Sequence, residues 1–262
     1  ASEALFHLGI PTSRALCLIA SDEMVYREKS EHGAMMIRVC QSHLRFGHFE
    51  YFFHSQQLDK LEHLFDYSFK YHFTELSDSP DRYALMLSRI VQDTAKMNTD
   101  NTSIHGITFD FGPYAFLDDF EPNYICNHSD PQGRYSFDSQ PGVGLWNLNA
   151  LAMAFSPYLS RQQITEVLNQ YEQHLLTEYG HIMRAKCGLK PNNVDNSAII
   201  NEWLDMLASE KKDYSVYFRL LCDFEPKLGV SSLRDSFIDR TRFDRWAQRL
   251  AHTLSEQNWP QE

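Results

Sequence analysis

Three side chains with oxygen donors lie within the short stretch MNTDNTSIHGITFDFG. Asp100 and Asn101 are adjacent, and Asp110 opens an Asp-Phe-Gly tripeptide ten residues after Asp100. Residues 102–105 and 107–109 alternate as short strands do, and the His-Gly pair between them suits a tight turn. We therefore predict a central hairpin that brings Asp100 and Asn101 next to Asp110.

Two carboxylates and an amide oxygen form the kind of site that holds Mg²⁺, or alternatively Mn²⁺, together with phosphate oxygens. A cation would also offset the mutual repulsion of the carboxylates. Alternatively, one carboxylate is free to orient or deprotonate an incoming hydroxyl group. The competing interpretation is structural, because Asn-Thr-Asp-Asn is a good turn sequence by itself and Asp-Phe-Gly also occurs by chance.

The same groups make up the active site of a protein kinase. There, a catalytic-loop Asp, a nearby Asn and the Asp of Asp-Phe-Gly share the work of phosphoryl transfer. In kinases the Asn follows the catalytic Asp by several residues, whereas Asp100 and Asn101 are adjacent, and no His-Arg-Asp precedes them. The spacing therefore disfavours a conventional kinase.

Composition excludes several classes of partner. The 262 residues include 24 basic and 35 acidic side chains, a net charge of −11. Nucleic acids and anionic membranes require a basic face, so we expect neither as a partner. The five cysteines show no metal-like spacing, which predicts reduced, mostly buried thiols and, with no signal peptide or apolar span, a cytoplasmic protein.

The pattern of apolar residues predicts a small strand-bearing part followed by a helical bulk. Three β-rich runs at 15–21, 24–28 and 34–40 follow a short helix that begins at Ser2 and ends at Gly9. Helical periods then cover residues 56–72, 81–96, 143–155, 160–186, 196–210, 212–225 and 231–254. Residues 113–141 carry many aromatic side chains, so we expect an ordered functional loop there.

Longer motifs carry a resemblance to a known family. MNTDNTSIHGITFDFGPYAFLDDFEP, YICNHSDPQGRYSFDSQP and LWNLNALAMAFSPYL closely resemble the selenoprotein O family, the kinase-like protein adenylyltransferases. SEALFHLGIPTSRAL and MIRVCQSHLRFGHFEYF resemble the same family. The similarity covers about the first 160 residues, and the helical tail is compatible but less distinctive.

The resemblance implies an α+β, protein-kinase-like fold that transfers AMP from ATP to protein Ser, Thr or Tyr hydroxyls with Mg²⁺. Carried over residue by residue, the proton acceptor falls on Asp100 and the metal ligands on Asn101 and Asp110. Two arginines that hold the phosphates of ATP fall on Arg38, in MIRV, and Arg45, in HLRFG. By itself, each arginine could equally form a surface ion pair, although a guanidinium also matches phosphate oxygens bidentately.

The implied architecture is a single kinase-like domain, residues 1–262, made mostly of the helical C-lobe with a few antiparallel strands from the N-lobe side. Residues 1–55 would form an N-lobe remnant and hinge, 56–142 the catalytic segment and 143–262 a helical C-terminal part. The family's glycine-rich segment and phosphate-contacting lysine lie upstream of Ser2. About a dozen residues also precede the Met-Asn-Thr-Asp-Asn motif in the family, so we expect a gap before Asn98.

Other residues admit a structural and a functional interpretation. His128 and Asp130 could assist acceptor binding, but a network that orders the loop is the favoured interpretation. Cys126 is expected to be a buried small hydrophobe. Trp146, Leu148, Leu151 and Phe155 are predicted to share one buried helical stripe, and Trp203 and Trp246 are predicted to be packing residues.

Three functions remain open from the sequence. The first is the Mg²⁺-dependent adenylyltransferase, whose partners would be ATP and proteins with acceptor hydroxyls. The second is a conventional protein kinase. The third is a catalytically inactive, kinase-like nucleotide-binding protein that keeps the fold without the reaction.

Overall fold

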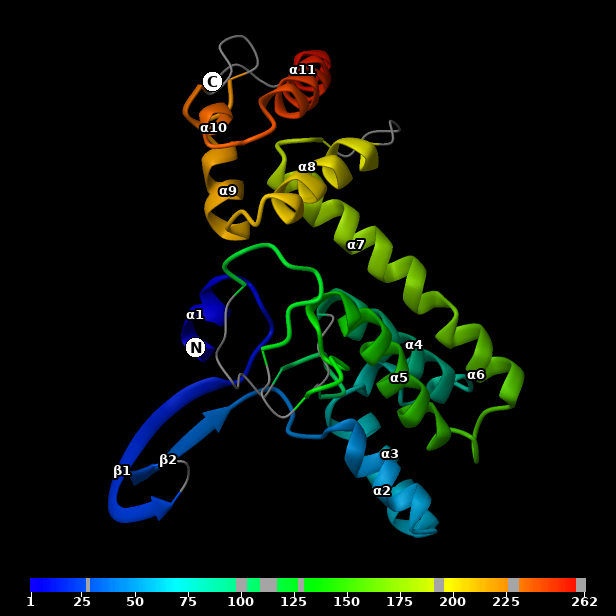
Figure 1. Ribbon diagram of the computed structural model, residues 1–262. Coiled ribbons are helices and arrows are strands. Elements are labelled where there is room, and N and C mark those ends of the chain that lie inside the picture. The colour runs from blue at the N-terminus through cyan, green and yellow to red at the C-terminus, as the bar shows by residue number, and fades with distance from the viewer. Residues whose placement is uncertain are drawn as a thin grey trace. The chain divides into compact units, whose positions relative to one another are not determined.

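The computed structural model describes residues 1–26, 29–97, 103–108, 117–126, 130–190, 196–225 and 231–257 (Figure 1). The chain divides into two compact units. Unit 1 comprises residues 1–114 and 140–175, and unit 2 comprises residues 115–139 and 176–262. The predicted division of one kinase-like domain into three consecutive stretches stays a prediction.

Unit 1 begins with a short helix and a two-stranded ribbon. Helix α1 (Ser2–His7) ends as predicted, because Gly9 has a φ of +79° that only glycine adopts readily. Ser2 is not its cap, since Ala1 occupies that position. The carboxylate of Glu3 accepts two hydrogen bonds from Arg14, of 2.7 Å from Nε and 2.5 Å from Nη2, and these bonds tie α1 to the start of β1.

Among the described residues, the structure has two strands where the sequence predicted three. β1 (Arg14–Tyr26) runs through the predicted turn at residues 21–23 and pairs antiparallel with β2 (Ser30–Val39). Residues 21–23 form an irregularity opposite Gly33, because Ala20 pairs with Ala34 and Met24 with His32. A Cβ atom on Gly33 would lie 3.2 Å from the carbonyl oxygen of Glu23. The absence of a side chain at Gly33 therefore leaves space for the extra residues 21–23, so that β1 continues past them.

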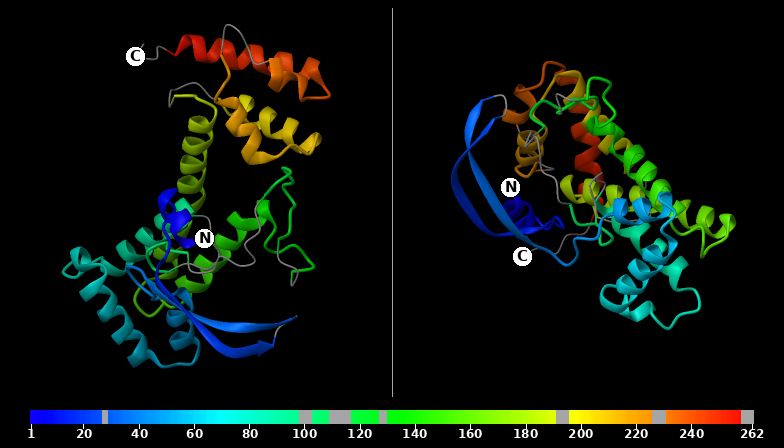
Figure 2. Two further views of the ribbon diagram at one scale, coloured as in Figure 1. Left: turned by 90° about the vertical axis from the view of Figure 1, so that its left-hand side faces the viewer. Right: turned by 90° about the horizontal axis from the view of Figure 1, so that it is seen from below.

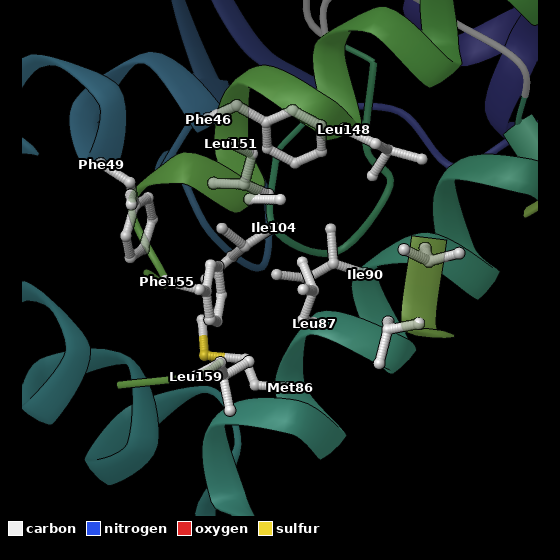
Figure 3. Close-up of a cluster of buried hydrophobic side chains, with 14 of the residues drawn as sticks. Phe46, Phe49, Met86, Leu87, Ile90, Ile104, Leu148, Leu151, Phe155 and Leu159 are labelled. Carbon is white, nitrogen blue, oxygen red and sulfur yellow. The ribbon is translucent and has the colours of Figure 1, made fainter. Parts of the chain in front are cut away.

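The helices of unit 1 enclose the larger core. They are α2 (Phe46–His54), α3 (Leu58–Tyr71), the short η1 (Thr74–Leu76), α4 (Arg82–Met97), α5 (Gln140–Met153), α6 (Arg161–Leu168) and the start of α7 (Gln170–Lys186). Helix α2 was not predicted. In Figure 3, Ile104 lies among Leu87, Ile90 and Phe155, and all four side chains are fully buried. The turn that contains Ile104 is therefore part of this core.

Unit 2 forms a second core around two stacked indoles. Its elements are η2 (Phe137–Ser139), the rest of α7, α8 (Ser197–Ser209), α9 (Tyr214–Leu221), α10 (Ser231–Asp235) and α11 (Arg240–Glu256). Trp203 and Trp246 are completely buried with ring centroids 4.5 Å apart. Trp246 also donates a 2.9 Å hydrogen bond to the carbonyl of Ile199, which fastens α11 to α8. Both are packing residues, as predicted.

Two predicted helices are divided. The helix predicted over residues 160–186 is interrupted at Asn169, which is the C-cap of α6. The one predicted over residues 231–254 is α10 and α11, and α11 restarts where the Asp239 side chain accepts a 2.9 Å bond from the Arg242 amide. Such a side-chain cap satisfies a helix end that periodicity alone does not locate.

Two predictions about burial are wrong. Leu148, Leu151 and Phe155 are buried, but Trp146 is 56% exposed. Trp146 lies two positions before Leu148, which at 100° per residue places it on the opposite side of α5. Of the cysteines, Cys187 is buried, whereas Cys17 and Cys222 are exposed and the other two, Cys40 and Cys126, are half-buried.

The α+β class is confirmed in its coarse form. The described residues are mostly helical and hold one two-stranded antiparallel sheet. No helix in the described ranges combines the length and apolarity needed to cross a membrane.

Candidate functional site

The predicted catalytic and metal-binding side chains, Asp100, Asn101 and Asp110, lie outside the described residues, as does His128. Their proposed roles stay predictions. In the described ranges, no group of three or more His, Cys, Asp or Glu side chains is placed to hold a metal. The structure does describe the turn between these residues, and it describes Arg38 and Arg45.

The predicted tight turn is present at residues 103–108. The amide of Gly106 donates a 3.0 Å hydrogen bond to the Ser103 carbonyl, and the Ser103 amide donates one of 3.0 Å to the Ile107 carbonyl. The buried Ser103 hydroxyl accepts from the amides of His105 and Ile107 at 3.1 and 3.3 Å. The two chain segments that lead to Asn101 and Asp110 therefore leave this turn from adjacent positions.

Beyond that hydrogen bond, the two sides of the turn do not pair as a ladder. Ser103 instead forms an antiparallel bridge with Arg45, and Thr108 a parallel bridge with Thr12. The predicted hairpin is thus a turn inserted between two other segments of unit 1.

Arg45 lies at the junction between the ribbon and α2. Its backbone pairs with Ser103, and the Ile104 amide donates a 3.0 Å hydrogen bond to the Leu44 carbonyl. Arg45 is also the N-cap of α2, where its own amide donates a 3.0 Å bond to Nδ1 of His48. The position of Arg45 beside the turn is therefore set by hydrogen bonds on both sides.

Arg38 lies near the end of β2. It is half-buried and pairs with Ala15 across the ribbon. Ala15 lies three residues after Thr12, which bridges Thr108, and the Thr108 amide donates to the Pro11 carbonyl at 3.2 Å. Arg45 therefore borders the turn directly, whereas the backbone of Arg38 is connected to the turn through the start of β1.

Sequence reasoning assigned the His-Gly pair to the turn but did not predict the close contact of Gly106 with Asp93 or the packing of His105. Gly106 has a φ of +67°, and a Cβ there would lie 3.0 Å from the carbonyl oxygen of Asp93 on α4. Burial raises the pKa of the Asp93 carboxyl, while Arg89 and Lys96 oppose that shift. The period of α4 offered one signal, since Asp93 follows the buried Ile90 by three residues and so shares its face.

His105 is the second residue of the turn whose contacts sequence reasoning did not predict. Its ring stacks on Phe73 with centroids 5.0 Å apart and meets His72 edge-on. Burial lowers the pKa of His105 to about 4, with smaller contributions from His72 and Arg89, so the ring is neutral at pH 7. Its Nε2 atom has no hydrogen-bond partner among the described residues. His105 therefore serves as a packing group beneath the turn.

The favoured interpretation of Asp130 is supported. Its buried carboxylate accepts hydrogen bonds from the amides of Arg134 and Tyr135 at 3.1 and 2.7 Å. The loop is also fixed to the segment that precedes α9, because the Phe120 amide donates a 2.8 Å bond to the Lys212 carbonyl. In the parts that are described, the aromatic loop is held by its own hydrogen bonds.

Comparison with known proteins identifies the family. The pattern of the family described as "Protein adenylyltransferase SelO" matches residues 1–261. The chain therefore belongs to this family.

A relative of known family supports the same assignment. The chain is 55% identical to the "Protein nucleotidyltransferase YdiU" of Pseudoalteromonas atlantica, and the match covers 98% of this chain. It covers 56% of the relative, so the chain spans a little over half of that protein's length. The 271 aligned positions exceed the 262 residues of this chain, so the relative carries residues in the aligned region that this chain lacks. That they fall before Asn98 stays a prediction.

Proposed function

We propose that the chain has the kinase-like fold of its family and transfers AMP from ATP to Ser, Thr or Tyr hydroxyls of proteins. Family membership supports the activity. The observation that carries the site is that Ser103 and Thr108, the two ends of the described turn, are bridged to Arg45 and Thr12. These bridges support the proposal that Arg45 lies close to the segments that carry the proposed metal ligands.

Each residue has a role that follows from its chemistry. Asp100 orients or deprotonates the acceptor hydroxyl. Arg38 and Arg45 grip phosphate oxygens, because a guanidinium donates two parallel hydrogen bonds to them. Asn101 and Asp110 offer the hard oxygen atoms that Mg²⁺ or Mn²⁺ prefers. When bound, the metal supplies charge neutralisation at the phosphates.

Catalysis of this kind depends on placement and electrostatics. Holding ATP and the hydroxyl together removes much of the entropic barrier, and fixed cationic donors stabilise charge that develops on the phosphates. The backbone hydrogen bonds of 3.0–3.5 Å around the turn fix the backbone that such placement needs. The chain carries a net charge of −11, which repels an anionic substrate. A local pair of arginines offsets this repulsion at the site.

Labelled ATP tests the proposal. The chain and the Pseudoalteromonas atlantica relative are each incubated with Mg²⁺, a mixture of soluble proteins and ATP labelled at either the α- or the γ-phosphate. We expect label from the α-phosphate on protein. The relative provides the comparison for the amount of label that the chain transfers. Label from the γ-phosphate on protein would instead show a conventional kinase.

Point variants separate the enzyme from an inactive nucleotide-binding protein. Asp110→Ala should lower transfer about 100-fold or more, as expected for loss of an electrostatic group at the reaction centre. Arg38→Ala and Arg45→Ala should each raise the KM for ATP. The matched controls Asp59→Ala and Arg161→Ala change exposed side chains of unit 1 and should leave transfer unchanged. If the unchanged chain transfers no AMP, and Asp110→Ala leaves its affinity for Mg²⁺-ATP unchanged, the chain is an inactive nucleotide-binding protein; unchanged transfer by Asp110→Ala would show that Asp110 does not hold the metal.

A further inference from the structure

Among the described residues, a row of cationic side chains lies on α11 in unit 2. This helix carries four arginines and no lysine in 17 residues. Arg242, Arg245, Arg249 and His252 follow each other at spacings of three or four residues, so they form one stripe. Phe243, Trp246 and Leu250 are buried on another face of α11. The stripe therefore faces away from the core of unit 2.

The stripe lines a groove. A cavity of about 620 Å³ is bordered by Glu202 of α8 and, on α11, by Arg242, Arg245, Gln248, Arg249 and His252. Helices α8 and α11 are neighbours in unit 2 (Figure 1). Every lining side chain is polar or charged, so the groove does not suit an apolar ligand.

The charges in the groove do not cancel. Glu202 pairs with Arg249 and lies 3.9 Å from Nε of Arg242. Arg242 also lies 3.9 Å from Asp205, whose side chain is 74% exposed. These separations are longer than a charge-assisted hydrogen bond of about 2.8 Å, so donor capacity remains on Arg242. The exposed Arg245 has no ion pair or hydrogen bond with another described residue.

We propose that the groove between α8 and α11 binds an extended acidic segment of a protein. Arg242 and Arg249 are seven residues apart, which is about 10 Å along a helix. In an extended peptide, three acidic residues at alternate positions point the same way and span about 13 Å, a length that the guanidinium side chains can cover. A single phosphate ion would contact only part of such a row.

Arginine is suited to this role because its planar fork pairs with carboxylates bidentately. At physiological ionic strength charges further away than about 8 Å are screened, so the net charge of the chain does not prevent local binding. This inference rests on the proposed function for its biological meaning: the acidic segment would belong to a protein that receives AMP. Binding itself can be measured without the reaction.

The test measures binding to a fluorescein-labelled peptide that contains Glu-Ser-Glu-Ser-Glu, with a Gln-Ser-Gln-Ser-Gln peptide as its uncharged counterpart. Fluorescence anisotropy should show binding of the acidic peptide alone, and rising salt should weaken it. Arg245→Glu should reduce the affinity about tenfold, because it replaces an attraction with a repulsion at an exposed site. Arg219→Glu makes the same charge change on an exposed residue of α9 and should reduce the affinity less than twofold.

Several results would overturn the inference. Equal binding of the two peptides, or equal affinities of Arg245→Glu and the unchanged chain, would show that the groove does not read acidic segments. Competition by inorganic phosphate at concentrations similar to those of the peptide would assign the groove to phosphate. A change of oligomeric state in Arg245→Glu, measured by sedimentation, would assign it to a second copy of the chain.

The transfer reaction distinguishes the two proposals. With an acceptor protein carrying the acidic segment, Arg245→Glu should raise the KM for that protein and leave kcat unchanged. If neither the unchanged chain nor any variant transfers AMP but the acidic peptide still binds, the proposed function is wrong and the proposed binding of acidic segments in the groove is retained. If AMP transfer proceeds and Arg245→Glu affects neither peptide binding nor KM, the groove fails and the proposed function stands.

Discussion

The turn at residues 103–108 and the β1–β2 ribbon are both reversals of an extended chain, yet their surroundings differ completely. In the turn, Ser103 and Ile104 are fully buried. In the ribbon, Leu18 is 72% and Tyr26 85% exposed, and both views of Figure 2 show the ribbon extending away from the helices of unit 1. Short reversals with few β-forming residues can thus be rigid when helices enclose them.

The comparison teaches that burial, and not β-propensity, decides the energetic weight of a strand-like segment. The ribbon has the more strongly apolar sequence, and its pairing is held by backbone hydrogen bonds between two strands. A two-stranded ribbon alone is marginally stable in water. The turn, by contrast, is stabilised by the core of α3–α5 into which Ile104 projects (Figure 3).

The largest expected effect comes from removing the side chain that embeds the turn. Ile104→Ala should lower the free energy of unfolding by about 2–5 kcal/mol, because it leaves a cavity in a closely packed core. Leu18→Ala in the ribbon should change it by less than about 0.5 kcal/mol. Urea unfolding of both variants measures the difference. Equal destabilisation would show that the ribbon is packed as firmly as the turn.

A smaller effect is expected from the backbone of the turn. Gly106→Ala should destabilise by about 1–2 kcal/mol, since an L-residue is strained at a φ of +67°, and the new Cβ would press on Asp93. Gly47→Ala in α2 is the matched control, because nothing lies within 4 Å of its Cβ position. It should be neutral or stabilising by up to about 1 kcal/mol. Similar thermal shifts for both variants would contradict a specific requirement for glycine in the turn.

The smallest effect is on pH dependence. His105 has its pKa lowered to about 4 by burial, so between pH 6.5 and 4 the unfolded chain binds a proton that the folded chain does not. Stability should therefore decrease as pH falls through this window. His105→Leu should flatten this decrease, whereas His181→Leu, at an exposed position of α7, should not. Unfolding free energies measured from pH 7 to 4 give the slopes, and equal slopes for all three proteins would sink this account of His105.

Much of the fold could be predicted from the sequence because local signals decided it. The end of α1 at Gly9, the helical periods of α3, α4 and α8, and the tight turn at Gly106 each depend on residues within one or two turns of chain. These signals are strong where capping residues, glycine and periodicity agree.

The failures in the strand-like segments have one physical origin, namely contacts with partners outside the local sequence. Gly33 accommodates the irregularity that keeps β1 continuous, and the pairing of Ser103 with Arg45 and Thr108 with Thr12 replaces a local ladder. No local pattern announces such partners. For the candidate site, Arg45 lies beside the turn, and the roles of Arg38, Arg45, Asp100, Asn101 and Asp110 all stay predictions.

The paired hydrogen bonds at Thr108 have a mechanical consequence. Its amide donates to Pro11, and its carbonyl accepts from the Ser13 amide at 3.5 Å; Arg14, the next residue, starts β1 and is clamped by Glu3. A force applied at the tip of the ribbon is thus delivered, through one short stretch of backbone, to the residue two positions before Asp110. The ribbon is therefore a lever that acts on Thr108, two residues before the start of the Asp-Phe-Gly segment.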